Sequence, residues 1–389
     1  ALQLRPDELE KQRKGGTWTA IFDANSFANE HPLIVWFAVI ELLGFAFLPL
    51  AAVLFRALPD RGYLLTKPLG FVVFAYAVWG PVSFGFADFA RTTVYLAFAG
   101  LLLFGVVTRS LWGPQLRELL RDHWRGILLA ETLFIAAFLA AYGVRLANPD
   151  LWHPYRGGEK PMELAYLNAV TRSTTMPPYD PWYAGGYINY YYYGQFMTAN
   201  VIKLTGILPE IAFNLAVPTY FAFTAGLVAS IAYNLAELAR RAIKRSPGFR
   251  RIPAWSSIWA AALAIFLVLL AGNVRGMSQG LERLSEASPR QSNVPIAGPV
   301  IEVAGGTLKL LRGGEVPYDY WEPSRAIALT SDQQGQTAPI TEFPMFTFMF
   351  ADLHAHLMVM PVSLLSVAAG LAAVASARTT RRWPRAWRL

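Results

Sequence analysis

Three side chains that could bind a metal or move a proton lie within five residues, at Asp352, His354 and His356. On a helix, Asp352 and His356 share a face and His354 points about 200° away, whereas extended backbone places all three on one side. The chain has no cysteine, and the spacing differs from the His-Glu-x-x-His zinc motif. We expect these residues to orient a substrate or to bind a divalent metal. A solvated helix cap is the alternative.

An acidic segment forms a second candidate for chemistry. If Pro161 begins a helix, Glu163 lies in its first turn. A carboxylate just outside a bilayer and beside Lys160 could serve as the general base that deprotonates an acceptor hydroxyl. The alternative is an acid that complements the helix dipole.

Four consecutive tyrosines, Tyr190, Tyr191, Tyr192 and Tyr193, form a third feature. Successive helical residues rotate by about 100°, so the four rings cannot all face one direction on a helix. They could form an aromatic belt at the lipid headgroups. They could instead form a wall that stacks on a sugar or a polyprenyl phosphate.

Arg325 follows an aromatic segment that contains Trp321. Its planar guanidinium suits a phosphate or pyrophosphate group. An ion pair with Glu322 is the alternative. Two acids, Glu41 and Glu131, lie within apolar segments, and we expect Glu41 to pair or to face a polar interior.

The composition indicates what kind of structure must position these residues. Of 389 residues, 54% are hydrophobic and 15% charged, whereas soluble domains carry about a quarter charged residues. Disordered, collagen-like and coiled-coil classes are excluded, and the absence of cysteine excludes disulfides, iron–sulfur clusters and thiolate zinc sites. The net charge of +8 comes from Lys and Arg between apolar blocks. This pattern indicates membrane topology and no nucleic-acid partner.

The apolar blocks predict an all-α membrane protein with about seven transmembrane helices. The predicted spans are residues 33–55, 69–86, 92–108, 126–146, 211–235, 257–271 and 346–375. Basic clusters at 240–251 and 378–388 belong in the cytoplasm by the positive-inside rule. Alternation of sides then requires that residues 190–208 do not cross. We expect them to form an amphipathic or re-entrant interfacial helix, with Asn200 and Lys203 at headgroup level.

This topology divides the chain into six segments. They are an extracytoplasmic N-terminal segment (1–30), four spans (31–146), a first long extracytoplasmic loop with interfacial helices (147–208), two spans (209–271), a second extracytoplasmic loop (272–344), and a span with a basic cytoplasmic end (345–389). The predicted location is the plasma membrane. Because the chain begins at Ala1 on the outside without a signal peptide, we expect it to be part of a longer polypeptide.

Several motifs together resemble a known family. They are Gly-Gly-Glu-Lys-Pro-Met-Glu, Pro-Pro-Tyr-Asp-Pro-Trp, Gly-Gly-Tyr-Ile-Asn-Tyr-Tyr-Tyr-Tyr-Gly, and Glu-Phe-Pro with Ala-Asp-Leu-His-Ala-His. This set looks like the YYY family of multi-pass membrane proteins, which is similar to the GT-C glycosyltransferases. The resemblance implies a GT-C-like fold and a polyprenyl-phosphate-linked sugar as donor.

The resemblance also implies roles for individual residues. Glu163, with Glu159 as second choice, corresponds to the catalytic acidic position. Arg325 and Lys203 become candidate phosphate contacts. The same motifs place Asp180 and Glu342, with the four tyrosines, among the candidate substrate-binding residues.

The predicted function is a membrane glycosyltransferase that moves a sugar to an acceptor at the extracytoplasmic face. Its partners would be membrane lipid, the lipid-linked sugar, and other membrane subunits or the rest of a longer chain. One alternative is a non-catalytic subunit of a larger membrane complex. A second alternative is a transporter with Glu41 and Glu131 on the ion path.

Overall fold

The computed structural model describes residues 4–14, 22–152, 158–244, 252–272, 274–292, 294–295, 297–319, 321–325, 327 and 339–379. Within these residues the structure is helical, and the pairing of Tyr179 with Tyr187 is an isolated antiparallel bridge. The prediction of an all-α protein is confirmed. The chain divides into two compact units, one of Ala1–Ala262 with Asp352–Leu389 and one of Leu263–Ala351.

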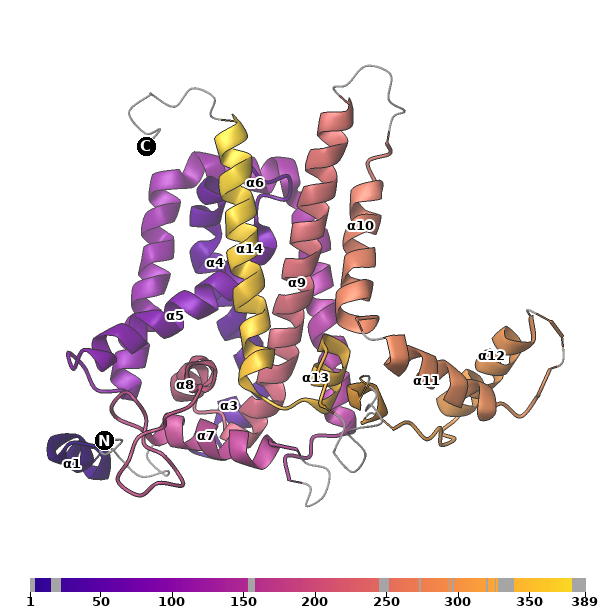
Figure 1. The fold of residues 1–389 in the computed structure, drawn as a ribbon. Helices are drawn as coiled ribbons and strands as arrows, with labels where there is room; N and C mark the ends of the chain where they lie inside the picture. Colours follow the sequence, from indigo (N-terminus) through magenta and orange to yellow (C-terminus); the bar gives the residue numbers. More distant parts are fainter. Residues whose placement is uncertain are drawn as a thin grey trace. The chain divides into compact units, whose positions relative to one another are not determined.

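The first unit is a helix bundle with shorter helices at one end. Its elements are α1 (Pro6–Lys14), α3 (Phe27–Glu30), α4 (Pro32–Leu54), η1 (Tyr63–Leu65), α5 (Thr66–Ser83), α6 (Arg91–Ala147), α7 (Lys160–Arg172), α8 (Tyr193–Thr205), α9 (Pro209–Lys244), most of α10 (Ser256–Ile265) and α14 (Ala355–Thr379). Figure 1 shows α4, α9 and α14 running along the bundle, with α7 and α8 at its lower end.

Five helices of the described chain are long and apolar enough to cross a membrane. They are Pro32–Leu54, Tyr63–Ser83, Arg91–Ala147, Pro209–Lys244 and Ala355–Ala377. The 57-residue helix α6 would measure about 86 Å if straight, nearly three times the thickness of a bilayer core. Its backbone leaves helical geometry at Trp112 and contains Pro114 two residues later. Helix α6 thus contains two of the predicted spans, joined across a bend.

The predicted number of seven spans depends on how two segments are counted. If α6 crosses twice, the five helices account for six of the predicted spans. The remaining one, residues 257–271, corresponds to α10 and a five-residue π-helical turn, η2 (Phe266–Leu270). That segment is long and apolar enough to cross a membrane only when it is counted as one bent span with α11 (Val274–Glu286), across a bend of 84°.

Close helix packing holds the bundle together at positions where a side chain would not fit. Helix α4 packs against α5 and α6, and α9 packs against α6 and α14. A β-carbon on Gly70 would lie 2.6 Å from the carbonyl oxygen of Leu43, and one on Gly105 would lie 2.7 Å from Cα of Ala46. Small residues allow helix backbones to approach closely, as is common within membranes.

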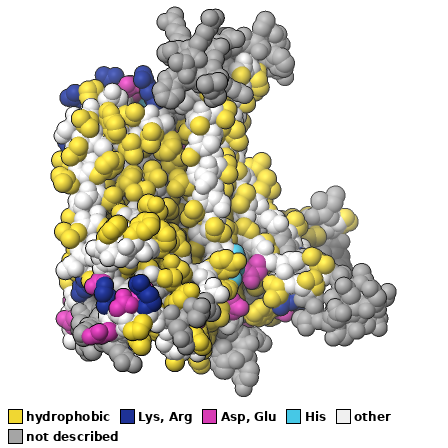
Figure 2. Space-filling model, turned by 60° about the vertical axis from the view of Figure 1, so that its left-hand side comes forward, with side chains coloured by type: hydrophobic (Ala, Val, Ile, Leu, Met, Phe, Trp, Pro, Cys, Tyr) yellow, Lys and Arg dark blue, Asp and Glu magenta, His cyan; other side chains and the backbone are white. Residues whose placement is uncertain are grey.

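The two ends of the bundle differ in charge. Arg61 contacts Glu118 and His123, which lie just after the bend of α6, at distances of 3.4 and 3.3 Å. We call the end of the bundle at the bend of α6 the basic end. It also carries further arginines, namely Arg56, Arg109, Arg117, Arg121, Arg125, Arg240 and Arg241. Figure 2 shows hydrophobic side chains over much of the bundle face between two ends where charged side chains gather. This distribution is that of a protein embedded in a bilayer.

The charged residues inside the bundle pair with one another. The ammonium of Lys67 lies 3.2 Å from Glu41 and also contacts Glu131, which accepts a hydrogen bond of 2.7 Å from the hydroxyl of Tyr63. The ammonium also lies 4.4 Å from the centre of the Phe134 ring. The expectation that Glu41 pairs is therefore confirmed. The arrangement stabilises charges that would be costly if isolated in the membrane.

Helix α8 is too short to cross a bilayer, as predicted for residues 190–208. Its 13 residues span about 20 Å, against about 30 Å of hydrocarbon. Asn200 and Lys203, expected at headgroup level, do not face lipid or water, because they are 0% and 3% exposed. The ammonium of Lys203 donates to the carbonyls of Phe89 and Ser173, the second at 3.1 Å. Helix α8 is thus packed into the protein.

The predicted continuous span 346–375 is also wrong. Helix α13 (Pro344–Phe350) ends at Ala351, which adopts a left-handed conformation with φ 57°. Residues 352–354 are not helical, and α14 begins at Ala355. The break places the Asp-x-His segment in non-helical backbone, just before the start of α14.

Within the described residues, the second unit contains η2, α11, α12 (Ala297–Leu311), the short 3-10 turn η3 (Glu322–Arg325) and α13. Glu322 contacts Arg275 and Gln279 on α11, and the hydroxyl of Ser285 donates to Glu302 on α12 at 2.5 Å. The second predicted loop is therefore partly helical.

Candidate functional site

Acidic, imidazole and phenol side chains meet at the end of the first unit opposite to the basic end. We call Glu159, Glu163, Tyr190, His354 and His356 the carboxylate–histidine cluster. It forms where three segments converge, namely the start of α7, the segment before α8 and the residues around the start of α14. Residues about 160 to 190 positions apart in sequence thus come into contact.

Glu163 lies in the first turn of α7, after Pro161, as predicted. Its side chain is 0% exposed, and Gln195 on α8 donates a hydrogen bond to Oε2. Among the described residues Oε1 has no hydrogen-bond partner, although it lies 3.8 Å from Nε2 of His354. Burial raises the pKa of this carboxyl to about 8, and the charges of Asp352 and Glu159 act in the same direction.

His354 is the centre of the cluster. Its Nε2 lies 3.0 Å from the hydroxyl of Tyr190 and 3.1 Å from Oε2 of Glu159. Its Nδ1 lies 2.7 Å from Nδ1 of His356, so one of these nitrogens donates and the other accepts. Because two Nδ1 hydrogens cannot face each other at this distance, the two rings cannot both be imidazolium ions.

Backbone contacts hold these segments in register. Oδ2 of Asp352 accepts a hydrogen bond of 3.1 Å from the backbone N–H of Glu159. The amide of Gln195 also donates to the carbonyl of Leu353 at 3.3 Å. Asp352 and Gln195 therefore connect the segment before α14 to α7 and α8.

Exposed aromatic rings adjoin the cluster. Tyr190 stacks on Tyr166 with ring centres 5.6 Å apart, and Tyr166 meets the edge of Trp182 at 5.0 Å. Tyr191 packs against Tyr190 at 5.1 Å. Trp182 is 60% exposed and Tyr191 69% exposed. These rings offer stacking surfaces next to the acid–base groups.

Glu159, Glu163 and His354 have the geometry to hold a divalent metal. One ligand atom from each lies within 4.8 Å of the other two. Neighbouring ligands of a tetrahedral ion with bonds of about 2.1 Å are about 3.4 Å apart. The distances of 3.1 and 3.8 Å from His354 Nε2 bracket that value. The oxygen of Glu163 without a hydrogen bond fits this donor set.

The ligand set differs from the predicted one of Asp352, His354 and His356. Only His354 belongs to both sets. Asp352 accepts a backbone hydrogen bond and His356 faces His354 through Nδ1. Asp352 and His354 lie in non-helical backbone, whereas His356 lies in the first turn of α14, so neither a continuous helix nor a continuous extended segment describes the three residues.

The other predicted substrate-binding residues of the first unit lie outside the cluster. Asp180 accepts backbone hydrogen bonds from Trp182 and Tyr183, which fixes a turn. Tyr192 accepts a hydrogen bond of 3.1 Å from the indole of Trp79. Tyr193 packs at the edge of the same Trp79 ring, and burial raises its pKa to about 12. Lys203 is buried against backbone carbonyls, as described above.

Arg325 and Glu342 belong to the second unit. The guanidinium of Arg325 donates to the hydroxyl of Ser324 at 2.7 Å and lies 5.6 Å from the centre of the Trp321 ring. Glu322 is paired with Arg275, so the alternative ion pair with Arg325 is not observed. Glu342 is exposed.

Sequence reasoning missed Gln195, Tyr166 and Trp182. Gln195 is one of the few polar residues on α8, and its position two residues after the tyrosine run is a weak signal. Tyr166 and Trp182 lie within predicted loop motifs, and nothing in their spacing links them to Tyr190. Their contacts arise only when α7 packs beside the loop.

The comparisons with known proteins identify the family. Residues 73–389 match the family model described as "Uncharacterized membrane protein (DUF2298)", which covers more than half of the chain. No curated protein and no solved structure matches the chain. The resemblance to the YYY family and to GT-C glycosyltransferases stays a prediction. The chain belongs to the membrane protein family DUF2298.

Proposed function

We propose that this protein transfers a sugar from a polyprenyl-phosphate donor to an acceptor at the extracytoplasmic face of the plasma membrane. The observation that carries the proposal is the convergence of Glu159, Glu163, His354 and Tyr190 beside exposed aromatic rings. The cluster lies at the end opposite to the basic end. By the positive-inside rule, that end belongs outside the cytoplasm.

Exposure favours Glu159 over Glu163 as the general base. The side chain of Glu159 is 56% exposed, whereas that of Glu163 is 0% exposed. A base must come within hydrogen-bonding reach of the proton that it removes. An acceptor hydroxyl can approach the exposed Glu159 but not the buried Glu163, so the order of the two predicted candidates is reversed in our proposal. Glu163 then acts as a positioning residue behind His354.

The proposed step is a direct displacement. The carboxylate of Glu159 takes the proton of the acceptor hydroxyl, and the hydroxyl oxygen forms a bond to the anomeric carbon. The bond from that carbon to the phosphate oxygen breaks, and its electron pair leaves with the polyprenyl phosphate. His354 and Tyr190 supply hydrogen bonds that orient the acceptor, and the exposed tyrosine and tryptophan rings supply a face on which a sugar can stack.

A divalent ion is the alternative occupant of these groups. Held by Glu159, Glu163 and His354, it would supply positive charge to the leaving phosphate in place of the base role of Glu159. Arg325 belongs to the second unit, and the proposed step gives it no role. Lys203 is left out, since its ammonium is buried on two carbonyl groups.

The test uses the full chain in lipid nanodiscs with polyprenyl-phosphate mannose or glucose, labelled in the sugar, and cell-envelope material as the source of acceptor. We expect label to leave the donor lipid with the wild-type protein. Glu159→Gln should reduce the rate by about 10²–10⁴, the usual contribution of a general base. Glu210→Gln is the matched control, because Glu210 is exposed in the first turn of α9 and has no part in the cluster.

Further arms of the same assay separate the alternatives. A chelator that abolishes release, with recovery on addition of Mn²⁺ or Mg²⁺, would assign the ion. The structural-subunit alternative expects Glu159→Gln and His354→Ala to behave like the wild type in every assay. No release from either donor by folded protein, or full activity of Glu159→Gln, would contradict the proposed function or the assignment of the base.

A further inference from the structure

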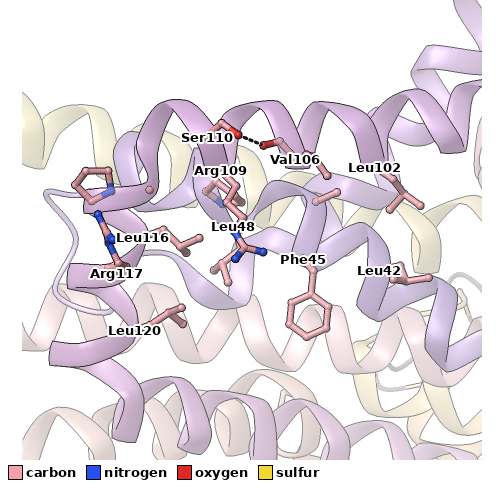
Figure 3. A pocket seen from close by; sticks show the side chains of 15 residues that line it. Leu42, Phe45, Leu48, Leu102, Val106, Arg109, Ser110, Leu116, Arg117 and Leu120 are labelled. Atoms are coloured by element: carbon pink, nitrogen blue, oxygen red, sulfur yellow. Dashed lines mark hydrogen bonds between the residues drawn. The ribbon is translucent and has the colours of Figure 1, made fainter.

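A groove at the basic end of the first unit is unrelated to the carboxylate–histidine cluster. Its cavity of about 730 Å³ is bounded by α4 and by both sides of the bend in α6. Apolar side chains make up most of its walls. They include Leu42, Phe45, Leu102, Val106, Leu116 and Leu120. We call this cavity the α4–α6 groove (Figure 3).

Two arginines line the same groove. Arg109 lies just before the bend at Trp112 and Arg117 just after it. Figure 3 shows Arg117 beside the bend and the guanidinium of Arg109 near Leu48, while Leu42 and Leu102 lie at the other end of the groove. The groove thus joins a cationic end to an apolar length.

The arginines have no counter-ion within the described part of the chain. The nearby acids are engaged elsewhere, because Glu118 contacts Arg61 at 3.4 Å and Asp122 contacts Arg121 at 2.7 Å. Neither Arg109 nor Arg117 forms a hydrogen bond or ion pair with a described residue, and both are exposed. Exposed, unpaired arginines at the edge of an apolar wall attract an anionic group.

We propose that the α4–α6 groove binds an anionic diacyl phospholipid of the cytoplasmic leaflet. The phosphate would lie between Arg109 and Arg117, and an acyl chain would follow the leucine, valine and phenylalanine walls. Several observations select a lipid over a soluble anion. Leu42, Phe45 and Val106 are 41%, 55% and 61% exposed, so the groove opens on the apolar flank of the bundle, where lipid is the solvent. The cationic end matches the anionic headgroups that gather at the cytoplasmic surface.

The bend in α6 creates this site. On a straight helix, Arg109 and Arg117 would lie about 12 Å apart along the axis and about 80° apart around it. The non-helical backbone at Trp112 and the proline at position 114 instead turn the second half of α6 back toward α4. Gly113 lines the groove, and a β-carbon built on it would meet nothing within 4 Å. The bend therefore leaves room for a headgroup beside both arginines.

Native mass spectrometry of the full chain in detergent can test this assignment. Phosphatidylglycerol and phosphatidylcholine with identical acyl chains are titrated against the protein. We expect the wild type to bind phosphatidylglycerol preferentially. The double variant Arg109→Ala/Arg117→Ala should bind phosphatidylglycerol about tenfold or more weakly, as expected for the loss of two cations near a lipid headgroup. Arg125→Ala is the matched control, because Arg125 is an exposed arginine of α6 that does not line the groove.

A charge-preserving variant and a competition experiment complete the test. Arg109→Lys/Arg117→Lys preserves the charge and should retain part of the preference, which separates lipid binding from misfolding. Glycerol phosphate, which has the headgroup but no acyl chain, should not compete. Equal binding of both lipids by the wild type, an unchanged preference in the double alanine variant, or competition by glycerol phosphate would overturn the lipid site.

Discussion

One hydroxyl joins the tyrosine run to the histidine pair. Tyr190 is the only one of the four consecutive tyrosines for which a described contact reaches His354, at 3.0 Å from its Nε2. We expect Tyr190→Phe to lower the rate of sugar release about tenfold while the fold is kept, because the ring contacts with Tyr166 and Tyr191 do not need the hydroxyl. Separate kcat and KM values from the nanodisc assay would measure the effect.

The control for this prediction is Tyr191→Phe. Tyr191 is 69% exposed and keeps its ring contact with Tyr190 after the change. It should retain wild-type kcat. Equal losses in the two variants would show that the tyrosine hydroxyls act through solubility or packing and not through His354.

A second residue-scale prediction concerns Lys203 and pH. Burial lowers the pKa of its ammonium to about 7, whereas a lysine in an unfolded chain titrates near 10.4. Between these values the unfolded chain holds one more proton than the folded one. Stability should therefore rise with pH across this window, by up to about 1.4 kcal/mol per pH unit, and should not change with this group below pH 7.

Thermal unfolding followed by tryptophan fluorescence measures this effect. The Tm of the wild type relative to Lys203→Met should increase from pH 7.5 to pH 9. Ile202→Met, a buried change beside it without a titratable group, should show no such trend. A constant difference between the wild type and Lys203→Met over that range would refute the stated titration.

At the scale of elements, the contact between α4 and α5 depends on the absence of a side chain. A β-carbon on Gly70 would lie 2.6 and 2.9 Å from backbone atoms of Leu43, which cannot move without moving α4. We expect Gly70→Ala to destabilise the protein by about 1–3 kcal/mol, the usual cost of overpacking. Gly100→Ala in α6 is the control, because nothing lies within 4 Å of that position. It should be neutral or slightly stabilising, since alanine favours a helix over glycine.

Hydropathy and charge could predict the elements that depend on local pattern. Helix α4 begins within one residue of its predicted start, Glu163 lies in the first turn of α7, and Glu41 is paired. The break at Ala351 was hard to predict, because neither proline nor glycine marks it, although Asp352, His354 and His356 interrupt the apolar run there. The same holds for the length of α6, in which a charged stretch resembling a loop remains helical.

The site was harder to predict than the elements. Glu159 and Asp352 are 193 positions apart in sequence, and their contact is set by how α7 and α14 pack. The sequence identified most of the chemical groups but grouped them by nearness along the chain. The metal set was therefore assigned to three neighbouring residues, whereas the structure brings His354 to the two glutamates.

At the scale of the whole molecule, the two proposals require opposite sides of the membrane. Sugar transfer needs the carboxylate–histidine cluster outside the cytoplasm, and the lipid site needs Arg109 and Arg117 at the cytoplasmic surface. Both requirements follow from one assignment of the two ends of the bundle to the two sides of the membrane. The bend of α6 lies at the basic end, where Arg61 contacts it. The two ends of α6 lie near α8 and α9, to which Arg91 and Arg145 donate hydrogen bonds. One topology measurement therefore tests them together.

The absence of cysteine makes single-cysteine labelling free of background. Ala184 is exposed in the loop beside the cluster, and Ala254 is exposed near Ser257, whose hydroxyl donates to Glu237 at the basic end. In intact cells that express the full chain, a membrane-impermeant maleimide should label Ala184→Cys at once and Ala254→Cys only after permeabilisation. The reverse pattern would place the cluster in the cytoplasm, where donor and acceptor of the proposed reaction are not presented. It would also move the α4–α6 groove to the outer leaflet, so both proposals would lose the charge argument on which they depend.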